Sequence, residues 1–183
     1  MNAPASTVNW KVSTRISVAA MALLGWLFGG CAGYRLGNIG GEAVQGVRSI
    51  YVPMVKNESY APDLQVVVTN AIQRRFDTDG TLRTTDSDHA DAELEVVVRR
   101  IYREALRPEV LDPLATAQYR VHIEAQATLI NRRLGRKTLD HVNVDGATTY
   151  FTQKDMVEAE RQALPLAAED LAKNLVSLVV EGW

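Results

Sequence analysis

The pattern of apolar and polar positions changes character at the only cysteine of the chain, Cys31. Residues 16–30 (ISVAAMALLGWLFGG) carry no charge, and the residues before them carry only Lys11 and Arg15. This apolar run is short for a membrane-spanning helix, which needs about twenty residues. A weakly basic segment followed by a short apolar stretch that ends in small residues is typical of a secretory signal peptide. We therefore expect residues 1–30 to be a leader that is removed.

The clearest β-strand pattern covers residues 117–130. Alternate side chains there are small or apolar, and the side chains between them are polar. One buried and one wet face is typical of an antiparallel sheet that is covered on a single side. The first set is Ala117, Tyr119, Val121, Ile123, Ala125, Ala127 and Leu129, and the second is Gln118, Arg120, His122, Glu124, Gln126 and Thr128.

Weaker alternation predicts further strands. They are expected over residues 47–54, 81–84, 92–104 and 138–150. Pro53 cannot donate a hydrogen bond to a neighbouring strand, so the first strand should lie at an edge or end there. Residues 131–137 are the predicted hairpin tip between the last two strands. Residues 105–116 contain Pro108 and Pro113 and predict an irregular loop or a break in the sheet.

Apolar residues at helical spacing predict two helices, over residues 62–79 and 152–181. Pro62 suits the first position of a helix, and Gly80 suits a left-handed cap at its end. The second helix contains Pro165, which should kink or restart it. Its start resembles a capping box, made by Thr152 and Asp155.

The order β-α-β-β-β-α, with residues 81–84 as a small extra strand, predicts an α+β fold. We expect a two-layer sandwich with two helices packed on one face of a mostly antiparallel four-stranded sheet. The glycine-rich stretch before it predicts a flexible tether. The expected organisation is a signal peptide at residues 1–30, a tether at 31–46 and one α+β domain at 47–183.

Composition and motifs narrow the range of functions that this chain could have. A net charge of −2 argues against a nucleic-acid partner, which would call for a basic domain. One cysteine excludes an intramolecular disulfide framework. A hairpin centred near Gly135 sets His122 opposite Ala147, away from His141. Carboxylates and serines show no catalytic or phosphate-loop motif, so we expect no enzymatic activity, no cofactor and no metal.

One cluster of charge stands out in the predicted hairpin tip. Arg132, Arg133, Arg136 and Lys137 place four cations there in an otherwise acidic domain. A solvated tip that keeps the sheet end from sticking to other sheets is one explanation. Recognition of an anionic ligand is the other, because guanidinium groups match phosphate oxygens. The residues themselves leave both open.

The end of the leader, Gly29-Gly30-Cys31, resembles the lipobox of bacterial lipoproteins, in which the cysteine is acylated and the leader is cut before it. Phe28 departs from the usual leucine at that position, and an uncleaved anchor with an incidental cysteine is the alternative. Several acyl chains would hold the protein to a membrane where one would not. By the same resemblance, Ala32 after the cysteine implies sorting to the outer membrane.

The order of the motifs is similar to that of the LPS-assembly lipoproteins called LptE. The matching stretches are residues 33–36 (GYRL) after the lipobox, 50–60 (IYVPMVKNESY), Pro62, 90–94 (ADAEL) and 119–120 (YR). The resemblance implies two helices on a four-stranded sheet and a plug inside the outer-membrane β-barrel LptD. It also implies help in assembling that barrel and binding of lipopolysaccharide. It assigns no residue to the lipid, so the tip cluster is our own hypothesis for that site.

Two other functions remain open at this point. An outer-membrane lipoprotein that regulates a periplasmic cell-wall synthase also begins with an anchored tether and a strand of the Val-Pro-x-x-x-Asn kind. The tether here is short for that task, because the stretch from Cys31 to the first strand reaches at most about 50 Å. A periplasmic hydrolase has no supporting group of residues.

Overall fold

The computed structural model of the chain describes residues 41–108, 116–151 and 155–181. Cys31, the predicted leader and the first part of the predicted tether lie outside these residues. Pro113 and Thr152 also lie outside them. Among the described helices, none is long and apolar enough to cross a membrane.

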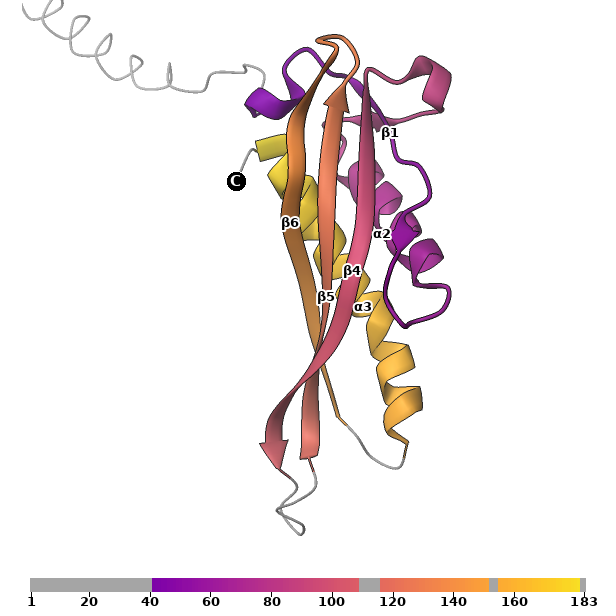
Figure 1. The fold of residues 1–183 in the computed structure, drawn as a ribbon, viewed down its shortest axis with the longest axis vertical. Helices are drawn as coiled ribbons and strands as arrows, with labels where there is room; N and C mark the ends of the chain where they lie inside the picture. The colour runs from indigo at the N-terminus through magenta and orange to yellow at the C-terminus, as the bar shows by residue number, and fades with distance from the viewer. Residues whose placement is uncertain (1–40, 109–115, 152–154, 182–183) are drawn as a thin grey trace, which may run out of the picture. The chain divides into compact units, whose positions relative to one another are not determined.

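Three long antiparallel strands form the main sheet (Figure 1). They are β4 (Ala92–Pro108), β5 (Thr116–Asn131) and β6 (Arg136–Phe151). Their register sets His122 opposite Ala147, as the sequence predicts. The predicted alternation in β5 is also confirmed, since Val121 and Ile123 are fully buried.

Two polar side chains near the end of β5 are buried, although the sequence predicts a wet position for Thr128. Thr128 is 5% exposed and Asn131 is 0% exposed. The register shifts between Ala127 and Leu129, which leaves an extra residue on β6. His141 lies in this bulge with a φ of 50°, and its N–H donates to Thr128 Oγ1 at 3.2 Å. The bulge therefore gives the buried hydroxyl a partner.

The sheet has six strands rather than the predicted four, and its short strands are parallel. β1 (Ser49–Tyr51) pairs with β3 (Arg83–Thr84) and with β4, and β2 (Lys56–Asn57) also pairs with β4. The small strand predicted over residues 81–84 is present as β3, whereas β2 is too short to show alternation in the sequence. The helix between β1 and β3 is the kind of crossover that brings a chain back as a parallel strand.

Prolines mark where strands stop. β1 ends at Tyr51, before Pro53, and the chain pairs with β4 again only at Lys56. The predicted break at residues 105–116 is wrong at both ends, because β4 continues to Pro108 and β5 already begins at Thr116. Pro108 is tolerated there because it is the last residue of the strand, after two irregularities in register.

Both helices begin later than the sequence predicts. α2 (Leu64–Asp79) starts after Asp63, whose φ of 60° is left-handed, so Pro62 precedes the helix. The predicted end is confirmed, since Gly80 has a φ of 75° and its N–H donates to Phe76 O at 2.9 Å.

α3 (Met156–Glu181) starts with a different cap from the one predicted. Asp155 Oδ1 accepts hydrogen bonds from the N–H groups of Val157 at 2.9 Å and Glu158 at 3.2 Å. Asp155 is therefore the N-cap residue itself. Pro165 lies inside one continuous helix, so of the two predicted outcomes, a kink or a restart, the restart is wrong.

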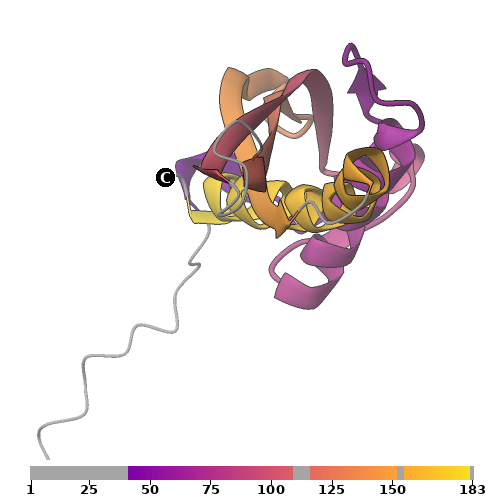
Figure 2. The ribbon, with the colours of Figure 1, turned by 90° about the horizontal axis from the view of Figure 1, so that it is seen from below.

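α3 packs against β5, β6 and α2, and Figure 2 shows it crossing one face of the sheet. The closest approach is at Gly146 in β6. A Cβ added there would lie 2.5 Å from the Ala167 carbonyl oxygen and closer still to the Leu171 nitrogen. The backbones of α3 and β6 thus meet with no room for a side chain. The core extends from there through Ala163, Ala167, Ala168, Leu171, Leu175 and Val179.

The last residues of the predicted tether are packed on the domain. A short 3₁₀ helix, η2 (Glu42–Val44), buries Ala43 and Val44. The N–H of Gly41 donates to the carbonyl oxygen of Val180 at 2.6 Å. The chain thus enters the domain beside the end of α3.

Replacing Gly146 with alanine should lower the free energy of unfolding by at least about 2 kcal/mol, because the added methyl group meets backbone that cannot move aside. Denaturant unfolding of the two proteins measures this change. Asp145→Ala is the matched control, since that side chain is exposed and should change stability by less than about 0.5 kcal/mol. Equal stability of Gly146→Ala and the native chain would contradict the close contact.

Candidate functional site

The hairpin tip brings the four predicted cations together, but three of them already have acidic partners. Arg132 pairs with Glu93 at 2.7 Å, Arg133 with Asp91 at 2.7 Å and Lys137 with Asp140 at 2.9 Å. No ion pair joins Arg136 to another side chain that the structure describes, and Arg136 is exposed. The tip is thus less positive than the sequence suggests. Arg136 is its most available cation.

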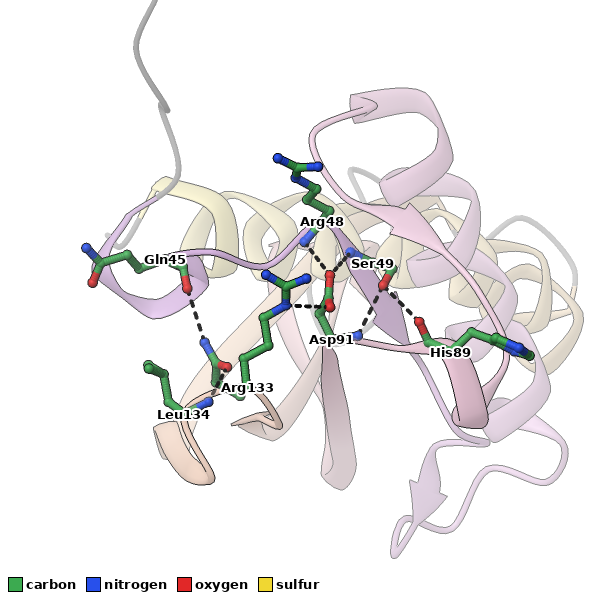
Figure 3. Close-up of polar contacts among 8 residues, drawn as sticks. Gln45, Arg48, Ser49, His89, Asp91, Arg133 and Leu134 are labelled. Carbon is green, nitrogen blue, oxygen red and sulfur yellow. Dashed lines mark hydrogen bonds and ion pairs between the residues drawn. The ribbon is translucent and has the colours of Figure 1, made fainter.

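Asp91 holds this end of the molecule together (Figure 3). Its Oδ2 accepts hydrogen bonds from the backbone N–H groups of Arg48 at 2.9 Å and Ser49 at 3.2 Å, and its Oδ1 accepts one from Arg133 Nε at 2.7 Å. Ser49 Oγ donates to the His89 carbonyl oxygen at 3.1 Å and accepts from the Asp91 N–H at 3.1 Å. One carboxylate therefore joins β1, β4 and the hairpin.

The same network lowers the pKa of Asp91. Partial burial alone would raise it, but the hydrogen bond from the Arg48 N–H and the guanidinium of Arg133 outweigh that effect and hold the pKa below its usual value. The carboxylate is therefore charged at neutral pH. Most of this charge is balanced by Arg133 and by the backbone N–H groups that bond to it.

Asn131 fixes the hairpin to the segment that enters the domain. Its side chain is fully buried, its Nδ2 donates to the Gln45 carbonyl oxygen at 3.4 Å, and its Oδ1 accepts the Leu134 N–H at 3.1 Å. Leu134 itself is 48% exposed at the apex of the tip. These hydrogen bonds give the tip a defined loop conformation.

The four tip cations are recognisable in the sequence, but their acidic partners are not. The signal lies in the pairing of Ala92 with Asn131, which brings the acidic start of β4 beside the tip. That register depends on the length of β4, and Pro108 and Pro113 hide in the sequence where this strand ends.

The outer face of the sheet, away from the helices, carries polar side chains around Arg100 and Glu124. Arg100 makes two hydrogen bonds with Glu124, of 2.5 and 2.9 Å, and the Tyr102 and His122 rings stack at 4.6 Å. A hollow lies on this face beside them. It is lined by Arg99, Arg100, Tyr102, Glu124, Ala125, Gln126, Asn143, Val144 and Asp145. We call this surface the polar sheet face.

A second polar cluster lies on the helix side, around Glu160. This residue is 9% exposed, and it pairs with Arg103 Nε at 3.0 Å. The hydroxyl groups of Tyr60 and Tyr150 donate to it at 3.2 and 3.4 Å. The carboxylate thus has partners from β4, β6 and the loop before α2. Burial, followed by the charge of Glu160, raises the pKa of Tyr150 to about 12.

Neither cluster has the composition of a metal site. No group of three His, Cys, Asp or Glu side chains among the described residues could hold a metal ion. His122 stacks on Tyr102 and lies 3.4 Å from Glu104, while His141 sits in the β6 bulge. Two surfaces remain as candidate binding sites. The tip could recognise a charged ligand, and the polar sheet face could make polar contacts with a partner.

Residues 47–179 match a protein family described as LptE, lipopolysaccharide-assembly. No curated protein matches the chain. The fold is similar to that of a protein from Xanthomonas campestris, with a TM-score of 0.53, 15% identity, and coverage of 72% of this chain and 83% of the other. A protein from Chlamydia trachomatis has a TM-score of 0.50 and 11% identity over 74% of this chain and 96% of the other.

The Asp91 network should stabilise the protein above about pH 4 and lose its effect below it. Because the pKa of Asp91 is lowered on folding, its contribution is present above the unfolded value, about 3.9, and disappears as the pH falls through the folded value. Urea unfolding of the native chain and Asp91→Asn from pH 7 to pH 3 tests this. The gap in stability between them should close toward low pH, and a gap that stays constant would contradict the network.

Glu160→Gln should lower the pKa of Tyr150 from about 12, since the carboxylate charge is one of its causes, while burial keeps it above the ordinary value of about 10. The raised pKa means that Tyr150 stabilises the folded state below about pH 10, an effect lost as the pH approaches 12. Ultraviolet titration of tyrosinate measures the shift, with Tyr150→Phe identifying the signal. An unchanged titration in Glu160→Gln would exclude the coupling.

Proposed function

This chain belongs to the LptE family of lipopolysaccharide-assembly proteins, and from that premise we propose that it is a lipid-anchored outer-membrane partner of the LPS-export barrel LptD. It assists assembly of the barrel and plugs it, and it contacts lipopolysaccharide on its way to the cell surface. It acts by binding and has no catalytic step. The observation that carries the proposal is the family match, which spans nearly all of the folded domain.

The anchor supports a partner in the same membrane. Cys31 is the proposed site of acylation, and the described chain begins at Gly41. The stretch between them reaches at most about 35 Å when extended. A domain held so close to the membrane suits a barrel in that membrane better than a cell-wall synthase across the periplasm.

The polar sheet face is the surface we assign to the barrel. The interior of a large β-barrel is polar and filled with water, so a plug needs a polar surface to lie against it. The Arg100–Glu124 pair and the polar side chains around the hollow supply such a surface. The opposite side of the sheet is covered by α3.

A photo-activated cross-linker tests this assignment. Placed at Gln126 on the polar sheet face of the full lipidated chain, it should capture a heat-modifiable barrel from outer membranes. The matched control is Arg161, an exposed position on α3, which should capture much less. Capture of a synthase at Gln126 would favour the regulatory function, and equal capture at the two positions would remove the sheet face from the proposal.

The hairpin tip is the surface we assign to lipopolysaccharide. Lipid A phosphates suit guanidinium groups, and Arg136 is the tip cation for which the structure describes no acidic partner. Arg132, Arg133 and Lys137 would contribute by exchanging or sharing their carboxylates. Each such exchange costs an existing ion pair, so these three should matter less.

Arg136→Glu should therefore weaken binding of lipopolysaccharide about two- to fivefold, the effect expected for one exposed charge pair. Binding to immobilised lipopolysaccharide measures the change. Arg161→Glu makes the same charge change on α3, away from the tip, and should bind like the native chain. If Arg136→Glu and a variant reversed at all four tip cations both bind normally, the tip is not the site.

A further inference from the structure

The sheet of this protein is not closed, so it has two edges. β6 lies at one edge, and the segment from β1 to β2 borders the other beside β3. The edge of β6 is the longer, with residues from Arg136 to Phe151. Open edges carry backbone groups that can pair with a strand of another molecule, so stable sheet proteins protect them.

α3 reaches over the middle of the β6 edge with two side chains. Asp170 Oδ2 accepts the N–H of Ala147 at 3.1 Å, and Asn174 Nδ2 donates to the carbonyl oxygen of Asp145 at 2.9 Å. These two backbone groups belong to alternate residues of the strand. Alternate residues of an edge strand point their N–H and C=O away from the sheet, toward an incoming strand. We call Asp170 and Asn174 the α3 clasp.

α2 makes a similar pair of contacts with the connection between β1 and β2. Thr69 Oγ1 accepts the N–H of Val55 at 3.0 Å, and Gln73 Nε2 donates to the carbonyl oxygen of Val52 at 3.3 Å. In both helices an acceptor is followed four residues later by a side-chain amide donor. Side chains at that spacing lie on one face of a helix. The same spacing of an acceptor and an amide donor thus joins α2 to the chain between β1 and β2.

The β6 segment beneath the α3 clasp would pair readily without it. Residues 142–151 (VNVDGATTYF) are rich in β-branched and aromatic residues, contain no proline and carry one charge, Asp145. Such segments are prone to pair with copies of themselves. An antiparallel pair of two copies centred on Gly146 sets Asp145 opposite Ala147 and Asn143 opposite Thr149, so no like charges meet.

We propose that the α3 clasp closes a latent self-pairing edge, so that β6 of one copy cannot add to β6 of a second copy of this chain. Adding a strand there requires the Ala147 N–H and the Asp145 C=O, and both are occupied by α3. The clasp leaves the polar sheet face and the hairpin tip as surfaces open to other molecules.

The test is the self-association of the full chain in detergent, followed by sedimentation velocity over a range of concentrations. Asp170→Ala with Asn174→Ala should shift the equilibrium toward a dimer at least about tenfold, since two edge groups are freed. The control is Glu158→Ala with Gln162→Ala, an acceptor and donor four residues apart on the same helix that bond to each other. It should sediment like the native chain.

Two further variants separate the clasp from a general loss of stability. Asp170→Asn keeps an acceptor oxygen and should stay monomeric. Asn174→Asp keeps the size of the side chain but turns the donor toward Asp145 into a charge, and it should dimerise. A folded double-alanine variant, checked by circular dichroism, that sediments as the native monomer would overturn the proposal. So would dimerisation of Asp170→Asn to the same extent as the alanine variant.

Discussion

The fold depends on the contact between the backbones of α3 and β6 at Gly146. Because no side chain separates them there, the helix lies directly on the strand, and the alanines of α3 fill the space on either side. The same turn of α3 that meets Gly146 carries Asp170, whose carboxylate then reaches the edge of β6. The position of the helix also fixes where the chain enters the domain, since Gly41 bonds to Val180 near its end. Packing, edge protection and the site of entry therefore follow from one close approach.

Polar side chains join the elements that this packing does not hold together. Asp91 joins the entering strand to the hairpin tip, and Glu160 joins α3 to β4 and β6 on the helix side of the sheet. Each carboxylate has several donors, which is what a partly buried charge requires. The acids that organise the tip also neutralise three of its four cations. A ligand with phosphates would therefore bind mainly to Arg136. It would not meet a broad positive patch.

The long elements were predictable because their patterns are long. The alternation of residues 117–130, the glycine at the end of α2 and the register of the hairpin all follow from the sequence. A strand of two residues leaves no periodic signal, so β2 and the parallel part of the sheet were missed, whereas β3 lies within the small strand predicted over residues 81–84. The tip cations were found as a cluster in sequence, whereas Asp91 and Glu93 reach them only through the pairing of β4 with β5. Glu160 was missed because a lone acid within a helical stripe resembles any exposed position.

The central claim is that this member of the LptE family acts in the delivery of lipopolysaccharide to the cell surface, anchored through Cys31. The most direct measurement is the amount of newly made lipopolysaccharide that reaches the outer surface of its native cell after depletion of the chain. We expect that surface lipopolysaccharide falls and that the native chain restores it, whereas Cys31→Ser restores it poorly. Normal surface lipopolysaccharide in depleted cells would contradict the account.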